Sequence, residues 1–203
     1  MKSKLVLIFL SLSLIGFSQN NPKPKLVVGI VVDQMRTDYI YRYWNRFGEG
    51  GFKRLVNQGF FCKNTHYNYV PTYTGTGHSS IYTGTTPQVH GIIANEWFVK
   101  ETKKETYCCD DSNVKTVGSA SKAGMMSPQW QLSTTLGDEL KLFSNGKAKV
   151  FGIALKDRSS ILPVGHAKGS MAFWYDDETG NFISSTWYTN ELPKWMQDFN
   201  ARK

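Results

Sequence analysis

The sequence predicts an α/β fold in which helices cover a largely parallel sheet. Residues 26–32 form a short, unbroken apolar run rich in β-branched residues, and 149–155 reads as a second buried strand. Such unbroken runs are typical of strands buried on both faces, as in parallel sheets. Between the predicted strands lie segments with helical spacing of their apolar residues. The 203 residues suffice for one domain, and a composition of 40% hydrophobic and 20% charged residues excludes collagen-like, coiled-coil and disordered chains.

The first 18 residues have the pattern of a secretory signal peptide. Lys2 and Lys4 precede the apolar stretch 5–17, and small residues at Gly16 and Ser18 stand before a predicted cleavage site. The alternative is a membrane anchor, but the stretch is shorter than the roughly 20 residues that span a bilayer. We therefore expect cleavage, no stable membrane anchor, and a periplasmic or secreted mature protein.

Charge and cysteines add weaker constraints. The net charge of +8 fits an anionic partner without specifying a reaction. Adjacent cysteines rarely bond each other, so Cys108 or Cys109 could pair with Cys62 or with a residue outside this chain, and all three could equally remain thiols.

The elements are expected in a definite order after the leader. A strand at 26–32 precedes a helix in which Tyr39, Tyr43 and Phe47 share one face, and glycines at 48–51 end that helix. The remaining expected elements are a helix at 52–57, a strand at 60–69, a tight turn into a short helix within 70–91, a helix at 134–143, a strand at 149–155, a hairpin turn at 176–180 and a helix beginning at Pro193. Residues 170–203 are expected to begin an inserted lid or cap region.

Polar residues follow both predicted buried strands directly. Asp33 comes after the first, and Lys156 and Arg158 come after the second. The carboxyl ends of strands in such sheets are where sites are built. An aspartate in this position is either a helix N-cap or a metal ligand, and the residues alone leave both open.

The segment VPTYTGTGHSS, residues 70–80, is a second candidate. Pro71 restricts the backbone, and the small residues after Thr74 permit a tight turn into a helix. A hydroxyl at the start of that helix would meet the positive end of its dipole, where a phosphate group is also stabilised. The alternative is a Ser/Thr-rich turn with an ordinary hydroxyl cap.

Taken together, these pieces resemble the alkaline phosphatase superfamily, in particular its type I phosphodiesterase/nucleotide pyrophosphatase branch. The resemblance is carried by Asp33, the threonine turn, TGTTPQVHGI at 83–92 and Asn95. Further ordered blocks, such as LKDRSSILPVGH at 155–166, are similar to secreted bacterial alkaline phosphatases of the PafA type. The resemblance covers residues 19–203 and implies a three-layer alkaline-phosphatase-like core, incomplete in this chain because family members are much longer.

The resemblance also implies roles for individual residues. Thr74 would be the nucleophile that forms a phospho-threonine intermediate, and Asp33 and Thr74 would be ligands of a pair of zinc ions. Asn95, Lys156 and Arg158 would bind the substrate phosphate. A monoester dianion carries one more negative charge than a diester, so two cations bind the monoester more strongly than the diester.

The expected function is therefore a secreted, zinc-dependent phosphate monoester hydrolase acting on small molecules rather than nucleic acid. This chain would be an inactive amino-terminal fragment, with the remaining zinc ligands beyond Lys203. Two alternatives are a phosphodiesterase or nucleotide pyrophosphatase on the same scaffold, and a non-catalytic extracellular polyanion-binding module. His78 and His90 are expected to be structural.

Overall fold

The computed structural model describes residues 24–202 and divides the chain into two units, 1–54 and 55–203, with the division inside α3. The predicted signal peptide, residues 1–18, lies outside the described residues. Within residues 24–202, none of the helices has both the length and the apolar character needed to cross a membrane.

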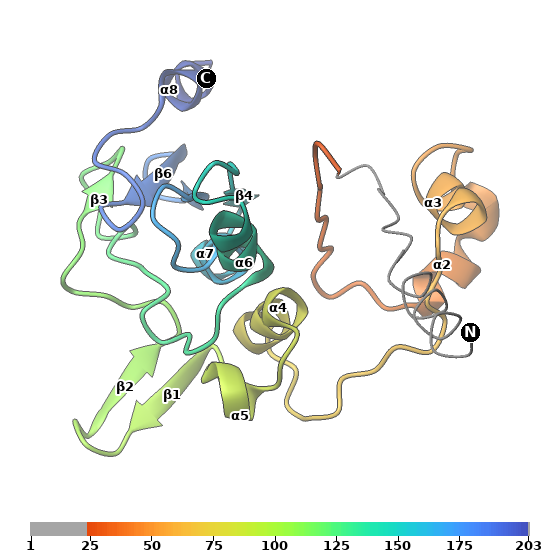
Figure 1. Cartoon of the computed structure of the whole chain (residues 1–203), viewed down its shortest axis with the longest axis horizontal. Coiled ribbons are helices and arrows are strands. Elements are labelled where there is room, and N and C mark those ends of the chain that lie inside the picture. The colour runs from red at the N-terminus through yellow and green to blue at the C-terminus, as the bar shows by residue number, and fades with distance from the viewer. Residues whose placement is uncertain (1–23, 203) are drawn as a thin grey trace, which may run out of the picture. The chain divides into compact units, whose positions relative to one another are not determined.

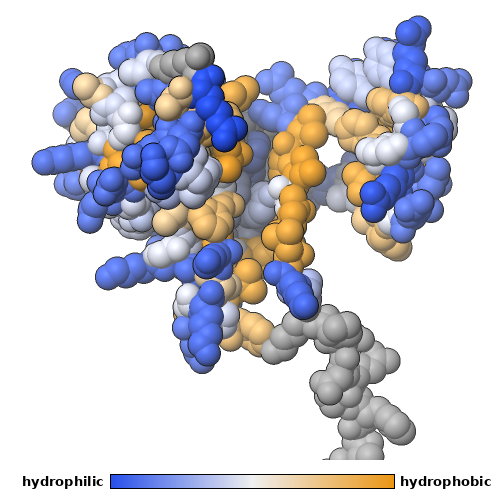
Figure 2. Space-filling model, turned by 90° about the horizontal axis from the view of Figure 1, so that it is seen from above, coloured by the Kyte–Doolittle hydropathy of each residue, from blue (hydrophilic) through white to orange (hydrophobic). Residues whose placement is uncertain are grey.

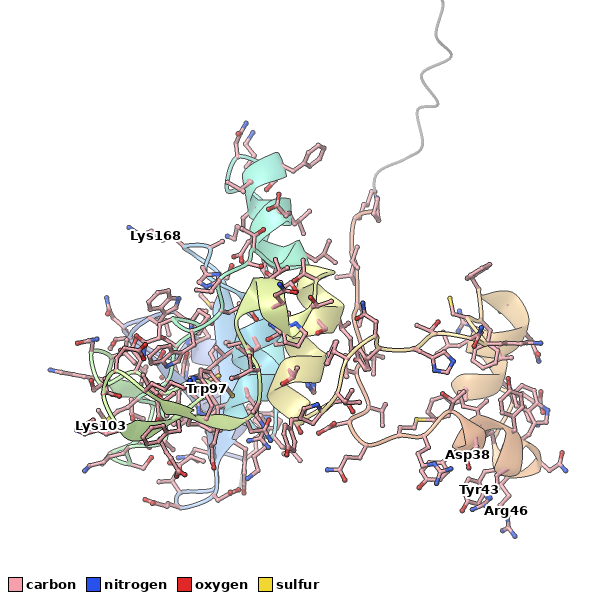
Figure 3. All side chains as sticks on the ribbon, turned by 90° about the horizontal axis from the view of Figure 1, so that it is seen from below. Asp38, Tyr43, Arg46, Trp97, Lys103 and Lys168 are labelled. Carbon is pink, nitrogen blue, oxygen red and sulfur yellow. The ribbon has the colours of Figure 1, made fainter. Side chains whose placement is uncertain are left out.

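The first unit contains short helices, and the helix expected at 52–57 is confirmed. They are α2 (Asp38–Arg42), the 3-10 helix η1 (Trp44–Arg46) and the start of α3 (Phe52–Gln58). The helix expected to carry Tyr39, Tyr43 and Phe47 on one face is confirmed only in part, because α2 ends at Arg42 and Phe47 lies in extended backbone. Tyr39 and Tyr43 share a face as expected, with ring centroids 6.0 Å apart. Figure 3 labels Asp38, Tyr43 and Arg46 on this group of helices.

The strands expected at 26–32 and 60–69 are wrong, because neither segment forms strand pairing among the described residues. The side chains of the first run are exposed, with Leu26 and Ile30 each 78% accessible. A strand is stable only where a neighbour satisfies its backbone hydrogen bonds, and the apolar pattern alone does not supply one.

The second unit holds the regular elements that carry the site (Figure 1). Its helices are α4 (Thr74–Thr83), α5 (Pro87–His90), α6 (Leu136–Phe143), α7 (Asp157–Val164) and α8 (Lys194–Asn200). Its strands are β1 (Glu96–Val99), β2 (Lys104–Tyr107), β3 (Thr116–Val117), β4 (Phe151–Ala154), β5 (Met171–Asp176) and β6 (Asn181–Ser185). The helices expected at 134–143 and from Pro193 are confirmed.

The main sheet has the order β3-β6-β5-β4, and it is mixed. β4 and β5 are parallel, whereas β5–β6 and β6–β3 are antiparallel. Helix α7 connects the two parallel strands and packs against both, and α4 packs on α7. The predicted turn at 176–180 joins β5 to β6, so the α/β class and this hairpin are confirmed.

The core lies between the sheet and α7. Its buried side chains include Ile161 and Leu162 of α7, Trp174 of β5 and Ile183 of β6. Burying one such side chain contributes about 1.5–3 kcal/mol, so this layer fixes α7 on the sheet. The β5, β6 and α8 residues belong to the segment 170–203, for which a lid or cap remains a prediction.

The strand predicted at 149–155 is confirmed as β4, but its expected burial on both faces is wrong in the described part of the chain. β4 is the edge strand of the sheet there, and Phe151 and Ile153 are 51% and 58% accessible. Gly152, between them, faces α7 closely. Figure 2 shows that hydrophobic residues, in orange, reach the surface of the molecule.

Candidate functional site

Thr74 is the first residue of α4, and the start of this helix is capped from outside. Tyr73 is the N-cap residue and its side chain makes no capping hydrogen bond. Instead, the backbone amide of Gly75 donates to the side-chain Oδ1 of Asn95 over 2.8 Å. The first amides of a helix have no partner within it, so Asn95 supplies an acceptor that α4 itself lacks.

Asn95 stands immediately before a β-hairpin that carries it to α4. β1 and β2 pair antiparallel, with Glu96 opposite Tyr107. The next residue, Cys108, donates its backbone amide to the carbonyl oxygen of Asn95 over 2.8 Å. Trp97 of β1 packs edge-on to Trp130 at 6.0 Å, and Lys103 lies at the other end of the hairpin (Figure 3). The hairpin thus ties Asn95 to the residues that follow β2.

The contact between α4 and the hairpin leaves no room for a side chain at Gly75. A Cβ there would lie 3.1 Å from Cys108 Sγ and 3.3 Å from Asn95 Oδ1. Glycine at this position therefore allows the helix start to approach Asn95.

Lys156 and Arg158 lie at the amino-terminal end of α7, directly after β4. Lys156 Nζ forms a 3.0 Å ion pair with Asp177, and both side chains are more than half exposed, so the pair contributes little stability. Arg158 Nη1 donates to the hydroxyl of Tyr107 over 2.9 Å. Its Nε is buried without a hydrogen-bond partner among the described residues.

Tyr107 and Asp157 were not predicted from the sequence, yet both hold Arg158. The Tyr107 hydroxyl donates to Asp157 Oδ1 over 2.5 Å, and the same oxygen accepts the backbone amide of Arg158 over 2.7 Å. Burial, together with the negative charge of Asp157, raises the pKa of Tyr107. Burial also raises the pKa of Asp157, although Tyr107 and Arg158 oppose that shift.

The structure brings four of the five predicted site residues into one unit. Thr74 and Asn95 meet at the start of α4, Lys156 and Arg158 meet at the start of α7, and the two helices pack together. A pocket of about 450 Å³ lies beside Lys156 and Arg158, and Tyr107 also lines it. The fifth residue, Asp33, belongs to the first unit, where its carboxylate accepts the backbone amide of Gln34 over 3.0 Å.

The described residues contribute few donors to a zinc site. A carboxylate and a hydroxyl, as in Asp33 and Thr74, are oxygen donors, and Zn²⁺ accepts carboxylate oxygen. However, residues 24–202 contain no group of three or more His, Cys, Asp or Glu side chains that could hold a metal ion. Residues 24–202 therefore do not make a complete zinc site by themselves.

The two histidines of the matched motifs make hydrogen bonds of the kind expected for a structural role. His78 Nδ1 donates to the carbonyl oxygen of Thr74 over 2.8 Å. His90 Nδ1 accepts the amide of Ile92, so the proton of the neutral ring is on Nε2, which donates to Ser80 Oγ over 2.9 Å. Burial lowers the pKa of His90. With Nε2 protonated, His90 cannot act as a base toward Ser80.

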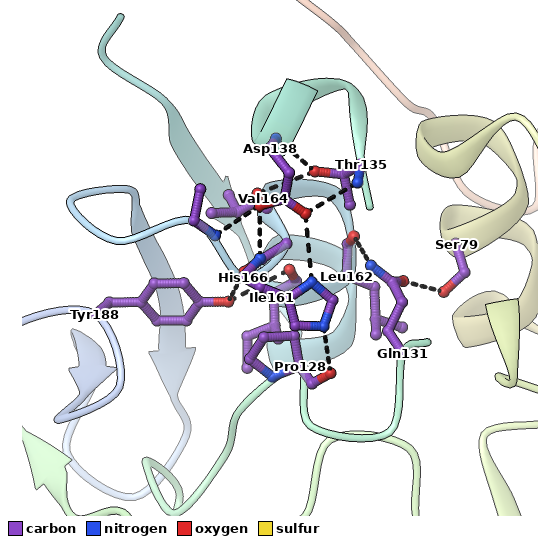
Figure 4. A network of polar contacts seen from close by, with 12 residues as sticks. Ser79, Pro128, Gln131, Thr135, Asp138, Ile161, Leu162, Val164, His166 and Tyr188 are labelled. Carbon is purple, nitrogen blue, oxygen red and sulfur yellow. Dashed lines mark hydrogen bonds and ion pairs between the residues drawn. The ribbon is translucent and has the colours of Figure 1, made fainter. Parts of the chain in front are cut away.

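A polar network fixes the carboxyl-terminal end of α7 (Figure 4). Gln131 donates to the carbonyl oxygen of Leu162 and accepts from Ser79 of α4, at 3.1 and 2.7 Å. Thr135, the N-cap residue of α6, donates to the carbonyl oxygen of Val164 over 3.2 Å. These bonds satisfy carbonyl groups at the carboxyl-terminal end of α7 and join that helix to α4 and α6. The end of α7 away from Lys156 and Arg158 is thereby held in place.

The cysteines are free thiols: Cys62 is exposed, and Cys108 and Cys109 are buried. Burial is the main cause that raises the pKa of the Cys109 thiol, and its interaction with the neighbouring Cys108 raises it further.

Comparison with known proteins identifies close relatives. Residues 27–203 match the family model described as type I phosphodiesterase / nucleotide pyrophosphatase. Alkaline phosphatase PhoV of Synechococcus elongatus is 54% identical over 187 residues, which cover 92% of this chain and 34% of PhoV. Alkaline phosphatase PafA of Elizabethkingia meningoseptica is 53% identical over 192 residues, covering 93% and 35%. A protein of Myroides odoratus named calcium-transporting ATPase is 51% identical over 186 residues, covering 92% and 34%.

Solved structures give the same result. Crystal structures of PafA match this chain with a TM-score of 0.87 and cover 89% of it and 35% of the PafA chain. One is the wild type, at 55% identity, and the other carries substitutions at a threonine, an asparagine, a lysine and an arginine. The chain thus spans about a third of the length of the relatives it matches.

Proposed function

The chain belongs to the type I phosphodiesterase/nucleotide pyrophosphatase family and has an alkaline-phosphatase-like fold, and from this premise we propose that the full-length protein is a zinc-dependent phosphate monoester hydrolase. One observation carries the proposal. The helix start that presents Thr74 is tied through Asn95 and the β1–β2 hairpin to the guanidinium of Arg158. The proposed hydroxyl nucleophile and the proposed phosphate clamp are therefore joined by one series of hydrogen bonds through the hairpin.

The substituted PafA variant supports the choice of site residues. Its threonine and asparagine are 21 positions apart, and its lysine and arginine are two apart. Thr74 and Asn95 have the first spacing in this chain, and Lys156 and Arg158 have the second. The same four residue types thus recur at the same spacings.

In the proposed reaction, the Thr74 oxygen attacks phosphorus, the alcohol leaves with the ester oxygen, and water later releases phosphate from the phospho-threonine. The positive end of α4 stabilises the charge of the transferred group. Asn95 uses its oxygen on Gly75, which leaves the side-chain NH₂ to donate to a phosphate oxygen. Zinc, when bound by oxygens such as those of Asp33 and Thr74, would lower the pKa of a coordinated hydroxyl.

Specificity for monoesters is assigned to Lys156 and Arg158. A planar guanidinium can donate two parallel hydrogen bonds to a phosphate, and Lys156 adds a second positive charge. A diester has one negative charge fewer and places an alkyl group where a monoester has a charged oxygen. The clamp therefore favours the dianion over the phosphodiesterase alternative on the same scaffold.

We also propose that residues 1–18 direct the protein to the periplasm or the outside of the cell, and that its substrates are small-molecule phosphate monoesters. Export of this kind suits an enzyme that releases phosphate from external esters.

The test is to measure hydrolysis of nitrophenyl phosphate and of methyl nitrophenyl phosphate by the full-length protein, with zinc content measured on the same sample. We expect about two zinc ions, a large preference for the monoester, and loss of turnover but not of phosphate binding in Thr74→Ala. The 203-residue chain, assayed beside it, is expected to be inactive. A preference for the diester would favour the phosphodiesterase alternative, and binding without any turnover would favour the polyanion-binding module.

A further inference from the structure

The β1–β2 hairpin touches both halves of the proposed phosphate site, at its two ends. Asn95, just before β1, caps α4, and Tyr107, the last residue of β2, contacts Arg158. Asn95 and Cys108 are joined by a backbone hydrogen bond of 2.8 Å. The hairpin therefore determines how far the Asn95 amide lies from the Arg158 guanidinium.

The direction of each hydrogen bond at Tyr107 follows from the chemistry of its partners. A guanidinium can only donate, so the 2.9 Å contact from Arg158 Nη1 uses a lone pair of the Tyr107 oxygen. The hydroxyl proton is then free to point at Asp157 Oδ1, which accepts it. The Tyr107 hydroxyl thus accepts from Arg158 and donates to Asp157 at the same time. Rotation of the Arg158 or the Asp157 side chain away from Tyr107 would break one of these bonds.

The ring of Tyr107 adds a second restraint. The central carbon of the Arg158 guanidinium lies 5.9 Å from the centroid of the ring, within the range of a cation–π contact. An arginine side chain otherwise has many rotamers, and fixing it costs entropy when a ligand binds. An arginine that is already held in place avoids that cost.

We infer that Tyr107 is a positioning residue that holds the Arg158 guanidinium, with Asp157 as its hydrogen-bond acceptor, in the orientation that binds a phosphate dianion. The inference rests on the proposed function for its substrate, and it adds a residue outside the phosphate-binding set.

The experiment compares Tyr107→Phe with wild type in the metal-loaded, full-length protein. The change removes the hydroxyl and keeps the ring. We expect kcat/KM for nitrophenyl phosphate to fall about tenfold, the scale of a lost hydrogen bond to a charged group. Hydrolysis of methyl nitrophenyl phosphate should change by less than about twofold, because a diester depends less on the Arg158 clamp. In an Arg158→Ala background, Tyr107→Phe should cause no further loss.

Tyr188→Phe is the matched control. The Tyr188 hydroxyl also bonds to the α7 region, donating to the carbonyl oxygen of Gly165 over 3.0 Å, at the opposite end from Arg158. Its loss should leave the ratio of monoester to diester turnover unchanged. Asp157→Asn provides a second variant, which keeps the Tyr107–Arg158 contact but weakens its acceptor, and it should shift the ratio in the same direction by a smaller factor.

Binding of inorganic phosphate, measured by calorimetry, separates this inference from the proposed function. Weaker phosphate binding in Tyr107→Phe than in Tyr188→Phe supports the positioning role even if the wild type hydrolyses neither ester, a result that would overturn only the proposed function. An equal fall for both esters, or a full additional loss in the Arg158→Ala background, would show that Tyr107 acts on the fold and not on Arg158. Absence of phosphate binding by the wild type would overturn both.

Discussion

The side-chain oxygen of Asn95 accepts a 2.8 Å hydrogen bond from the backbone amide of Gly75, the residue that follows Thr74. The two ends of the Asn95 amide are therefore separated in role: the oxygen holds the start of α4, and the NH₂ group is assigned to the phosphate.

Variants of Asn95 can separate these roles. Asn95→Asp keeps an oxygen acceptor for Gly75 but replaces the NH₂ donor with negative charge, which repels a phosphate dianion. We expect it to keep the thermal midpoint within a few degrees while phosphate binding falls more than in Asn95→Ala. The alanine variant should lose about 1 kcal/mol of stability, the value of a helix cap. Scanning calorimetry and phosphate titration on both variants measure these effects. Tighter phosphate binding by Asn95→Asp than by Asn95→Ala would contradict the assigned role of the NH₂ group.

Gly75→Ala should damage the same contact from the other side. The new Cβ would lie 3.1 Å from Cys108 Sγ and 3.3 Å from Asn95 Oδ1, so one of them must shift. We expect a loss of about 1–3 kcal/mol, the usual cost of overpacking, together with reduced turnover.

Gly77→Ala, in the same helix, is the control for Gly75→Ala. Its Cβ would meet only the Tyr67 hydroxyl group, at 3.5 Å or more, which is an ordinary contact. The change should stabilise α4 by up to about 1 kcal/mol, since alanine is the better helix former. Thermal midpoints of the two variants that moved in the same direction would refute the packing argument.

Local signals predicted the elements whose stability is itself local. The helix at 134–143 was predicted, and the structure gives it a reciprocal cap between Thr135 and Asp138. The turn at 176–180 was predicted from its residue types in the same way. The strand at 26–32 was wrong because strand formation depends on a partner, which the apolar pattern does not specify.

The candidate site divides along the same line. The residue patterns marked the threonine turn and the charged residues after the strand at 149–155 as candidates, and the family resemblance assigned roles to Thr74, Asn95, Lys156 and Arg158. Tyr107 was not found, because it contacts Arg158 across 51 positions of sequence. Only the register of the β1–β2 hairpin, with Tyr107 opposite Glu96, brings it to that place.

His90 predicts one pH dependence of stability. Burial lowers its pKa in the folded state, and the unfolded chain takes up a proton near pH 6.5. The unfolded state therefore binds more protons at low pH, and stability should be complete above about pH 6.5 and fall as the pH drops below it. The slope from this group is at most about 1.4 kcal/mol per pH unit. His90→Gln, which does not titrate, should show a shallower fall between pH 6.5 and 5.5 in chemical denaturation.

His166 and Asp138 predict the opposite trend. The hydrogen bond that the His166 ring donates to the Asp138 carboxylate raises the pKa of His166. Burial opposes ionisation of Asp138, but bonds from His166 and from backbone amides lower its pKa. The pair therefore stabilises the fold most between about pH 4 and 6.5, and its contribution is lost as pH rises through the pKa of His166 or falls through that of Asp138.

The measurement for this pair is an NMR titration of isotope-labelled histidine. Asp138→Asn should lower the pKa of His166, whereas Glu139→Gln, at an exposed position of the same helix, should leave it unchanged. A pKa for His166 that did not respond to Asp138→Asn would show that the 3.3 Å contact carries no charge interaction.

The ion pair between Lys156 and Asp177 leads to a prediction about affinity. Both side chains are exposed, at 56% and 71%, and their 3.0 Å contact holds the lysine that is assigned to the phosphate. Asp177→Asn releases Lys156 from this competitor and removes a negative charge from the pocket it lines. Because an exposed pair is worth at most about 1 kcal/mol, we expect phosphate to bind about two- to fivefold more tightly at low salt. Salt near 1 M shortens the screening length to about 3 Å and should remove most of the gain.

Asp198→Asn, which breaks the exposed Lys194–Asp198 pair, is the matched control and should leave phosphate binding unchanged. Equal gains in the two variants would attribute the effect to net charge and not to Lys156.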